Sequence, residues 1–409
     1  MKRHLALLVI ATLALSLTGC SLFQTSKDNQ DQPTVLKLAL REGTYSQVVG
    51  MNIRDFEDQN NVRCELLELS EEELYNTILN SSDSASKVDL CMVSGSWMSE
   101  FTSKELLCDL SEYGYSLDED IIKETTDICY YNGDVYCAPY FGNVSVLMYN
   151  KKMVEDAGYT TEDISSLEDV FKICESAQDA GYFGFLYRGD TNNDVVVDFL
   201  PILLSYGGWV VDENNQPTVN SVEFKEAMEF YKRLTATGKA TTKDDIVNAL
   251  SASHGAMTIG WPGWYVPTED GPVDYMALSG RAAEGAEVFN ANLYGIWALG
   301  VSSYSNHKEE TMELLNYLMD PELQKKSVFS GGVPCRYSAL SNEEILAEYP
   351  QYRNVLEALE SGVYRPSLPN WNEFMDILAP YMTSILDGSL STEDGLNQAQ
   401  AELETLMGL

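Results

Sequence analysis

Aromatic and charged residues follow the short apolar runs of this sequence, which we expect to be buried β-strands. Runs at 35–40, 88–93, 183–187 and 255–260 precede such residues, namely Glu42, Tyr45, Ser96, Trp97, Arg188, Asp190, Trp261, Trp264 and Tyr265. The flat face of an aromatic ring packs on the C–H groups of a pyranose, and sugar hydroxyls need paired donors and acceptors. Tryptophans beside carboxylates and arginine therefore favour sugar binding.

Each tryptophan also has a purely structural interpretation. Trp261 and Trp264 are as well suited to packing between two lobes as to binding. Trp209, in the YGGWV segment, is similarly placed after an expected helix, and we include it among the candidates. Trp371 follows Pro369 and is better explained by packing.

Residues for catalysis are scarce. Apart from His4, only His254 and His307 carry an imidazole, and neither lies near a nucleophile motif. The sequence has no P-loop, dinucleotide fingerprint or zinc-binding helix motif. Carboxylate pairs are common in so acidic a chain, so a glycosidase-like pair stays open as an alternative. We expect no enzyme activity, no metal and no cofactor.

The elements that would position the candidates form an α/β pattern. Strand-like runs at 35–40, 62–69 and 88–93 alternate with helical stretches, and Ser70 with Glu73 forms a capping box at a helix start. This order predicts parallel strands with right-handed crossovers. Ligands of such sheets bind beyond the carboxyl ends of the strands, where the candidates lie.

The rest of the chain continues the same fold class. Ser166 and Asp169 form a second capping box, and the apolar spacing over 220–238 predicts a helix. We expect strands at 255–260 and 296–301, and only helices from about residue 306 onward. The body of about 375 residues exceeds what one hydrophobic core usually supports, so we expect two lobes.

The N-terminus has the pattern of an export signal. Lys2 and Arg3 precede an apolar run that ends in Leu-Thr-Gly-Cys at 17–20. We interpret 1–19 as a signal peptide, Cys20 as a lipidated first residue, and 20–33 as a flexible tether. This predicts an exported protein held on the outer face of the cell membrane only by its lipid.

The net charge limits the classes of partner, and one pair of cysteines could form a disulfide. The formal net charge is −37, with 63 acidic and 26 basic residues. A field of that sign repels nucleic acid and anionic lipid, so we expect neither as a partner. Cys129 and Cys137 flank an Asn132-Gly133 turn, and they are either a disulfide or two free thiols.

Six segments follow one another in a distinctive order: NGDVYCAPYFGNVSVLMYNKKMVEDAGY at 132–159, SLEDVFKICESA at 166–177, YGGWVVDENNQPTVNSVEFKEAMEFYKRL at 206–234, GAMTIGWPGW at 255–264, YLMDPELQKKSVFSGGVPCRYSAL at 317–340 and SLSTEDGLNQAQAEL at 389–403. In this order they resemble family 1 of the extracellular solute-binding proteins, the group that contains the maltose-binding protein. The segment 187–198 matches no part of the family pattern.

The resemblance implies an α/β, two-lobed periplasmic-binding-protein-like (type II) fold. Its lobes would comprise 34–139 with 294–335 and 140–293 with 336–409, joined by crossings near Ala138–Gly142, Asn290–Ile296 and Val333–Tyr337. It adds Tyr140, Asn143 and Arg336 to the candidate ligand contacts. The function implied is that of a monomeric receptor of an ABC importer, which closes on a small solute and delivers it to a membrane permease.

Two other functions fit the residues. A receptor for a polyamine or another small cation would suit the acidic balance and the Trp-Asp combinations equally well. An extracellular sensor module could have kept the fold without transport.

Overall fold

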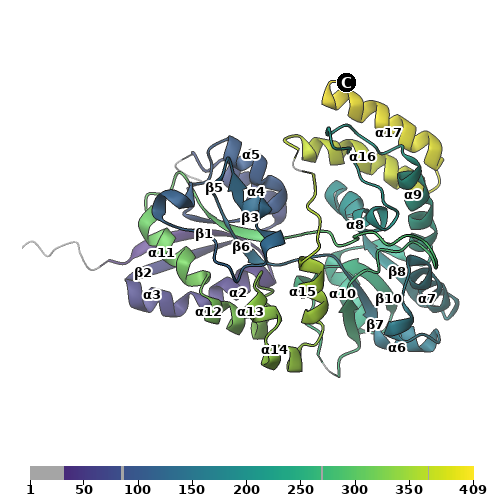
Figure 1. Ribbon diagram of the computed structural model, residues 1–409, viewed down its shortest axis with the longest axis horizontal. Helices are drawn as coiled ribbons and strands as arrows, with labels where there is room; N and C mark the ends of the chain where they lie inside the picture. The colour runs from purple at the N-terminus through teal and green to yellow at the C-terminus, as the bar shows by residue number, and fades with distance from the viewer. Residues whose placement is uncertain (1–31, 84–86, 269, 367) are drawn as a thin grey trace, which may run out of the picture.

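The protein has two lobes, each built on a five-stranded sheet covered by helices (Figure 1). The computed structural model describes residues 32–83, 87–268, 270–366 and 368–409. The expected signal peptide, Cys20 and most of the tether lie outside the described residues. The buried apolar side chains form two hydrophobic cores, which we call the first-lobe core and the second-lobe core.

The first-lobe sheet has the order β2-β1-β3-β12-β6. Strand β1 lies between β2 and β3 and is parallel to both, as the alternating pattern predicted, whereas β12 runs antiparallel to β3 and β6. Its strands are β1 (Thr34–Arg41), β2 (Val62–Leu69), β3 (Leu90–Ser94), β6 (Ala138–Phe141) and β12 (Trp297–Val301).

Helices on both sides of this sheet complete the first lobe. The predicted capping box starts α4, because Ser70 Oγ accepts from the Glu73 amide and the Glu73 carboxylate accepts from the Ser70 amide. The helices are α2 (Thr44–Asn52), α3 (Arg54–Asn60), α4 (Glu71–Leu79), α5 (Met98–Ser103), α11 (Lys308–Leu318) and α12 (Pro321–Ser327).

The second-lobe sheet has the order β11-β7-β10-β8-β9, with β8 parallel to β10 and β9, and β7 antiparallel to β10 and β11. The strands are β7 (Val146–Asn150), β8 (Phe183–Arg188), β9 (Lys239–Thr241), β10 (Gly255–Gly260) and β11 (Val273–Met276). The helices are α6 (Lys151–Asp156), α7 (Leu167–Asp179), α8 (Asn192–Ser205), α9 (Val222–Thr235), α10 (Lys243–Ser251), α16 (Trp371–Leu386) and α17 (Thr392–Met407).

Short elements fill the connections between these helices and strands. They are the strands β4 (Tyr130–Tyr131) and β5 (Asp134–Val135), and the 3₁₀ turns η1 (Gly95–Trp97), η2 (Leu110–Tyr113), η3 (Lys123–Thr125), η4 (Asp127–Cys129), η5 (Thr161–Asp163), η6 (Pro262–Trp264) and η7 (Val328–Ser330).

Three chain segments lie side by side where the lobes join. The first connects β6 to β7 and the second connects β11 to β12, near the predicted positions. They are joined by the hydrogen bond from the Gly295 amide to Asn143 O (2.9 Å). The third differs from the prediction at Val333–Tyr337. It connects α15 to α16, and its Val363 exchanges backbone hydrogen bonds with Asn292 and Tyr294.

The third crossing comes later because three helices intervene: α13 (Tyr337–Leu340), α14 (Glu343–Glu348) and α15 (Tyr352–Leu359). Although 336–409 was assigned to the second lobe, its start contacts the first lobe, where Ser338 donates to Asp120. Buried side chains of α14 and α15 belong to the first-lobe core, whereas α16 and α17 pack against α8 and α9.

The cysteine pair flanks the hairpin of β4 and β5, but its two members are not directly opposite each other. Tyr130 pairs with Val135, so Cys129 lies opposite Tyr136 rather than Cys137. Both cysteines are buried and are free thiols in the structure. Burial, with a contribution from the neighbouring Cys137, raises the pKa of the Cys129 thiol well above its usual value.

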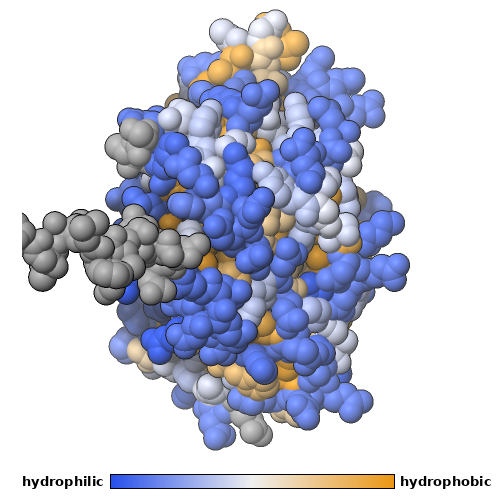
Figure 2. Space-filling view, turned by 90° about the vertical axis from the view of Figure 1, so that its left-hand side faces the viewer, coloured by the Kyte–Doolittle hydropathy of each residue, from blue (hydrophilic) through white to orange (hydrophobic). Residues whose placement is uncertain are grey.

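The surface reflects the acidic composition. The face of the first lobe in Figure 2 is mostly hydrophilic, with small separate hydrophobic areas. Among the described residues, no helix has both the length and the apolar character needed to cross a membrane.

Candidate functional site

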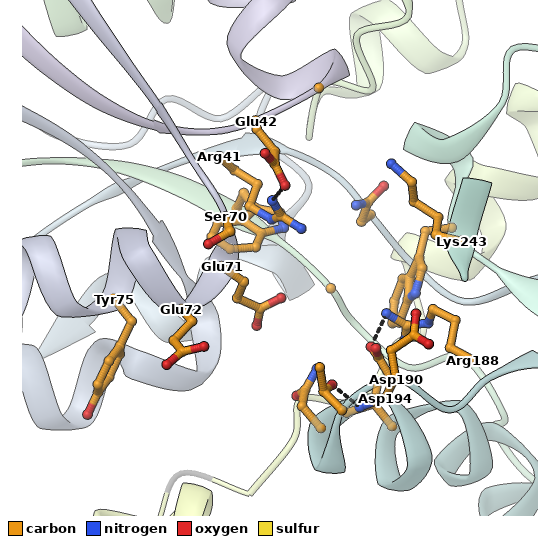
Figure 3. Close-up of a pocket in the computed structure, with 18 of the residues that line it drawn as sticks. Arg41, Glu42, Ser70, Glu71, Glu72, Tyr75, Arg188, Asp190, Asp194 and Lys243 are labelled. Carbon is orange, nitrogen blue, oxygen red and sulfur yellow. Dashed lines mark hydrogen bonds and ion pairs between the residues drawn. The ribbon is translucent and has the colours of Figure 1, made fainter. Parts of the chain in front are cut away.

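A cleft of about 950 Å³ lies between the two lobes. Figure 3 shows its opposing sides: Arg41, Glu42, Glu71 and neighbours from the first lobe face Arg188, Asp190, Asp194 and Lys243 from the second. The volume is within the range of small-molecule sites.

Nine of the thirteen predicted ligand-binding residues line this cleft. The carboxyl ends of β1, β3, β8 and β10 meet at this edge, as expected for α/β sheets. The nine residues are Glu42, Tyr45, Ser96, Trp97, Asn143, Arg188, Asp190, Trp261 and Trp264.

Four predicted site residues lie elsewhere, so the structure corrects their placement. Tyr140 is 4 % exposed within the first-lobe core, because the strand before the crossing turns its ring inward. Tyr265 packs against the same core, and Trp209 packs against the second-lobe core. Arg336 is buried in the first lobe, where it pairs with Asp118 outside the cleft.

Arg336 has a structural role there. Its guanidinium pairs with Asp118 (2.7 Å) and Asp120 (3.3 Å) and donates to Gln324. Burial acts to raise the pKa of Asp120, but hydrogen bonds from Ser338 and Arg336 outweigh it, so the pKa is lowered. These bonds hold α13 on the segment before the cysteine hairpin.

Aromatic rings form much of the wall of the cleft. Trp97 and Trp297 meet edge to face with ring centroids 5.4 Å apart, and Tyr45 lies 5.8 Å from Trp297. Trp261 packs closely on Gly295, where an added Cβ would come within 2.6 Å of the indole. Four of the six tryptophans of the sequence line the cleft: Trp97, Trp261, Trp264 and Trp297.

Trp297 was not predicted, although the strand at 296–301 was. The rule that ligands lie beyond strand carboxyl ends holds for parallel strands. Because β12 runs antiparallel to β3, its first residue lies at the cleft edge, with Trp297 opposite Ser94. The direction of this strand is set by the second crossing, which no local sequence pattern reveals.

Arg188 is fixed by two acidic residues of α8. The Asp198 carboxylate accepts from the Arg188 amide (3.0 Å) and from its guanidinium (2.5 Å), and Asp194 forms a second ion pair. Burial acts to lower the pKa of Arg188, but the two carboxylates outweigh it and raise the pKa, so the guanidinium stays charged. It lies 5.1 Å from the Trp264 ring centroid, a cation–π contact.

The segment that matched no family pattern, 187–198, supplies this cluster. It contains the end of β8 and the first turns of α8, whose N-cap Thr191 accepts from the Asp194 amide. Thr191 and Asp194 repeat the spacing of the two predicted capping boxes, so the helix start was detectable from sequence.

Asn143 links the lobes at the base of the cleft. Its side-chain amide donates to Tyr45 Oη (2.5 Å), and its carbonyl oxygen accepts from the Gly263 amide (3.2 Å). Burial raises the pKa of Tyr45 to about 12, so the phenol is protonated at neutral pH. Because Tyr45 Oη accepts from Asn143, its own proton is available to a ligand.

Other charged residues of the cleft escaped prediction. Glu71 and Glu72 begin α4, directly after β2, so the strand-end rule applied to the second run would have found them. Lys243 follows β9 in the same way. Arg365 and Asp376 come from the third crossing and from α16, where no strand end marks them.

Comparison with known proteins identifies the family. The family model of the bacterial extracellular solute-binding proteins matches residues 52–354. The chain belongs to this family. A "Probable ABC transporter-binding protein" of Deinococcus radiodurans is 22 % identical over 293 residues, 68 % of this chain and 70 % of that protein. The diacetylchitobiose binding protein of Streptomyces coelicolor is 23 % identical over 322 residues, 72 % of this chain and 71 % of that protein.

A solved structure confirms the fold of this solute-binding protein. The maltose-bound MalE3 of T. maritima superposes with a TM-score of 0.79 at 22 % identity, covering 91 % of this chain and all of that chain. The predicted α/β, two-lobed fold is thus confirmed. The protein is a solute-binding protein of an ABC transporter, an extracellular and non-enzymatic family whose partner is a membrane permease.

Proposed function

We propose that this solute-binding protein captures a carbohydrate in the cleft between its lobes and delivers it to its permease. One observation carries the proposal: four tryptophans line the cleft together with carboxylates, guanidinium groups and an amide. Aromatic faces pack against sugar rings, and the polar groups supply donors and acceptors for hydroxyls.

The polar groups of the cleft offer hydrogen-bond donors that suit the hydroxyl groups of a neutral ligand. Tyr45 offers a proton, and Arg188 is held rigidly by Asp194 and Asp198, so it can present donors at little cost in side-chain entropy. A maltose-bound protein with the same fold and a relative named for diacetylchitobiose support the proposal.

Capture is proposed to involve closure of the lobes about the three crossings, with Asn143 near the axis. The protein would be held on the outer face of the membrane by a lipid on Cys20, with 20–33 as tether. Substituting Cys20 by serine and following the protein into the membrane or soluble fraction tests the anchor: anchoring predicts loss from the membrane fraction.

A thermal-shift screen of residues 34–409 tests the ligand class. A ligand that binds only the folded state raises the melting temperature. Mono- and oligosaccharides, polyamines and amino acids form the panel. A rise with one family of sugars is expected, and a rise with polyamines alone would contradict the carbohydrate proposal.

A small cation such as a polyamine is the second candidate, favoured by the charge of the cleft. Seven acidic residues line it against four basic ones. Glu71, Glu72 and Asp190 form no ion pair or hydrogen bond with any described residue. Calorimetric titration with putrescine separates the candidates, because a cation would bind with an affinity that falls steeply with salt, whereas a neutral sugar would not.

A further inference from the structure

A second cavity of about 290 Å³ lies on the first lobe beside the cleft. It is lined in part by Gly95 of η1 and by Met98 and Thr102 of α5. Its walls come from η4, β4 and the third crossing. No part of the carbohydrate proposal above uses this cavity.

The two cavities share a wall. Ser96 and Trp97 line the cleft, whereas Gly95 and Met98, on either side of them in sequence, line the second cavity. Arg365 lines both. The second cavity is therefore the space next to the cleft that a longer ligand would meet on the side of Arg365 and η1.

The walls of the second cavity have the same chemistry as the cleft. Tyr130, Tyr131 and Tyr364 present aromatic rings, and Asp127 presents a carboxylate. Tyr364 is fixed, because its hydroxyl donates to Thr125 O (2.7 Å) and its ring lies 4.6 Å from that of Tyr294. Tyr130 is 47 % exposed, a large aromatic surface left facing solvent.

Several polar groups at this cavity are exposed or half-buried and are not engaged by other side chains of the described residues. The Asp127 carboxylate and the hydroxyls of Ser99, Tyr130 and Tyr131 have no hydrogen-bond partner within the described part of the chain. Arg365 donates to Asn193 Oδ1 (3.2 Å) and forms no ion pair with any described carboxylate. A guanidinium carries five donors, so most of them are available to a ligand passing between the cavities.

We propose that the second cavity is an additional sugar subsite, lined by Tyr130, Tyr131 and Tyr364, and that the protein therefore takes an oligosaccharide that extends from the cleft past Arg365. The inference rests on the carbohydrate proposal. One sugar unit would stack on the tyrosines, with its hydroxyls donating to Asp127 and accepting from Arg365.

Calorimetry with two series of increasing length tests the subsite: maltose to maltohexaose, and diacetylchitobiose to its hexamer. Three variants are compared with the wild type. Tyr130→Ala removes an exposed ring, Ser99→Phe fills the cavity, and Tyr113→Ala is the matched control, because Tyr113 is an exposed tyrosine that lines neither cavity.

In the wild type, we expect affinity to rise about tenfold at the length that reaches the subsite, from one added stacking contact with its burial. Tyr130→Ala and Ser99→Phe are expected to lose this rise and to keep the affinity for the shorter sugars. Tyr113→Ala is expected to keep both the rise in affinity with sugar length and the affinity for the shorter sugars. Melting curves establish that each variant folds. Tyr130→Ala enlarges the cavity whereas Ser99→Phe fills it, so a loss common to both points to the subsite itself.

The outcomes separate the two proposals. If sugars bind but affinity does not rise with length, or if the variants weaken short and long sugars equally, the subsite is refuted and the carbohydrate proposal stands. If neither series nor any other sugar binds the wild type, the carbohydrate proposal fails and the subsite fails with it.

Discussion

Replacing Trp264 by alanine is expected to weaken ligand binding far more than it destabilises the free protein. The indole lines the cleft, over the end of β10, where an added Cβ on Gly260 would lie 2.9 Å from the ring. It is only half-buried, and its principal polar contact is the cation–π contact with Arg188 at 5.1 Å. The part of the indole that stays exposed lines the cleft, where a ligand can contact it.

The magnitudes follow from these contacts. Stacking of a sugar ring contributes about 1 kcal/mol beyond burial, and burial of one ring face contributes about 1 kcal/mol more. The loss of about 2 kcal/mol corresponds to a Kd about 30-fold higher. The free protein loses the cation–π contact and partial burial, about 1 kcal/mol, or about 2 °C in a protein of this size.

Calorimetric titration measures the Kd and differential scanning calorimetry the melting temperature, with the sugar that gives a thermal shift. Trp209→Ala is the matched control, because Trp209 is also half-buried but packs on the second-lobe core outside the cleft. We expect the control to lower the melting temperature and leave the Kd unchanged. If Trp264→Ala lost as much stability as binding energy, Trp264 would be a core residue and the reasoning would be wrong.

Three further predictions concern the fold. Gly362→Ala should lower the melting temperature by several degrees in a calorimetric scan, because its Cβ would lie 2.0 Å from the Tyr294 ring in the third crossing; an unchanged transition would contradict this packing. Cys129 and Cys137 should both react with a thiol reagent in denaturant without reductant, and an intact mass lower by two hydrogens would show a disulfide instead. The pKa of Asp120 is lowered in the folded state, so its contribution to stability is present above the unfolded value of about 3.9 and is lost as pH falls through the folded value. Asp120→Asn should therefore melt lower than the wild type at pH 7, with the difference closing in more acidic solution; a difference independent of pH would contradict the assignment.

Local patterns predicted much of the fold. The strands at 62–69 and 255–260 have the predicted bounds, and both predicted capping boxes start helices, α4 and α7. These features depend on neighbours in sequence, through hydrogen bonds to the first turn of a helix and through apolar runs. The strand-end rule then placed most of the candidate residues at the cleft.

What depended on long-range contacts was harder to predict. The third crossing was placed too early, because the turn before α13 has the composition of a connection but stays on the first lobe through Arg336. Trp297 was missed because strand direction follows from the crossing. Arg365 reaches the cleft from the third crossing, beside α8 of the second lobe, through its hydrogen bond to Asn193.

The most direct test of the central claim is a titration followed by tryptophan fluorescence, because four of the six tryptophans line the cleft. A carbohydrate bound there is predicted to change the emission saturably, with the same Kd as calorimetry, and the change should be much smaller in Trp264→Ala. A sugar that raises the melting temperature without changing the emission would bind outside the cleft, and saturation by putrescine alone would show that the ligand is a cation.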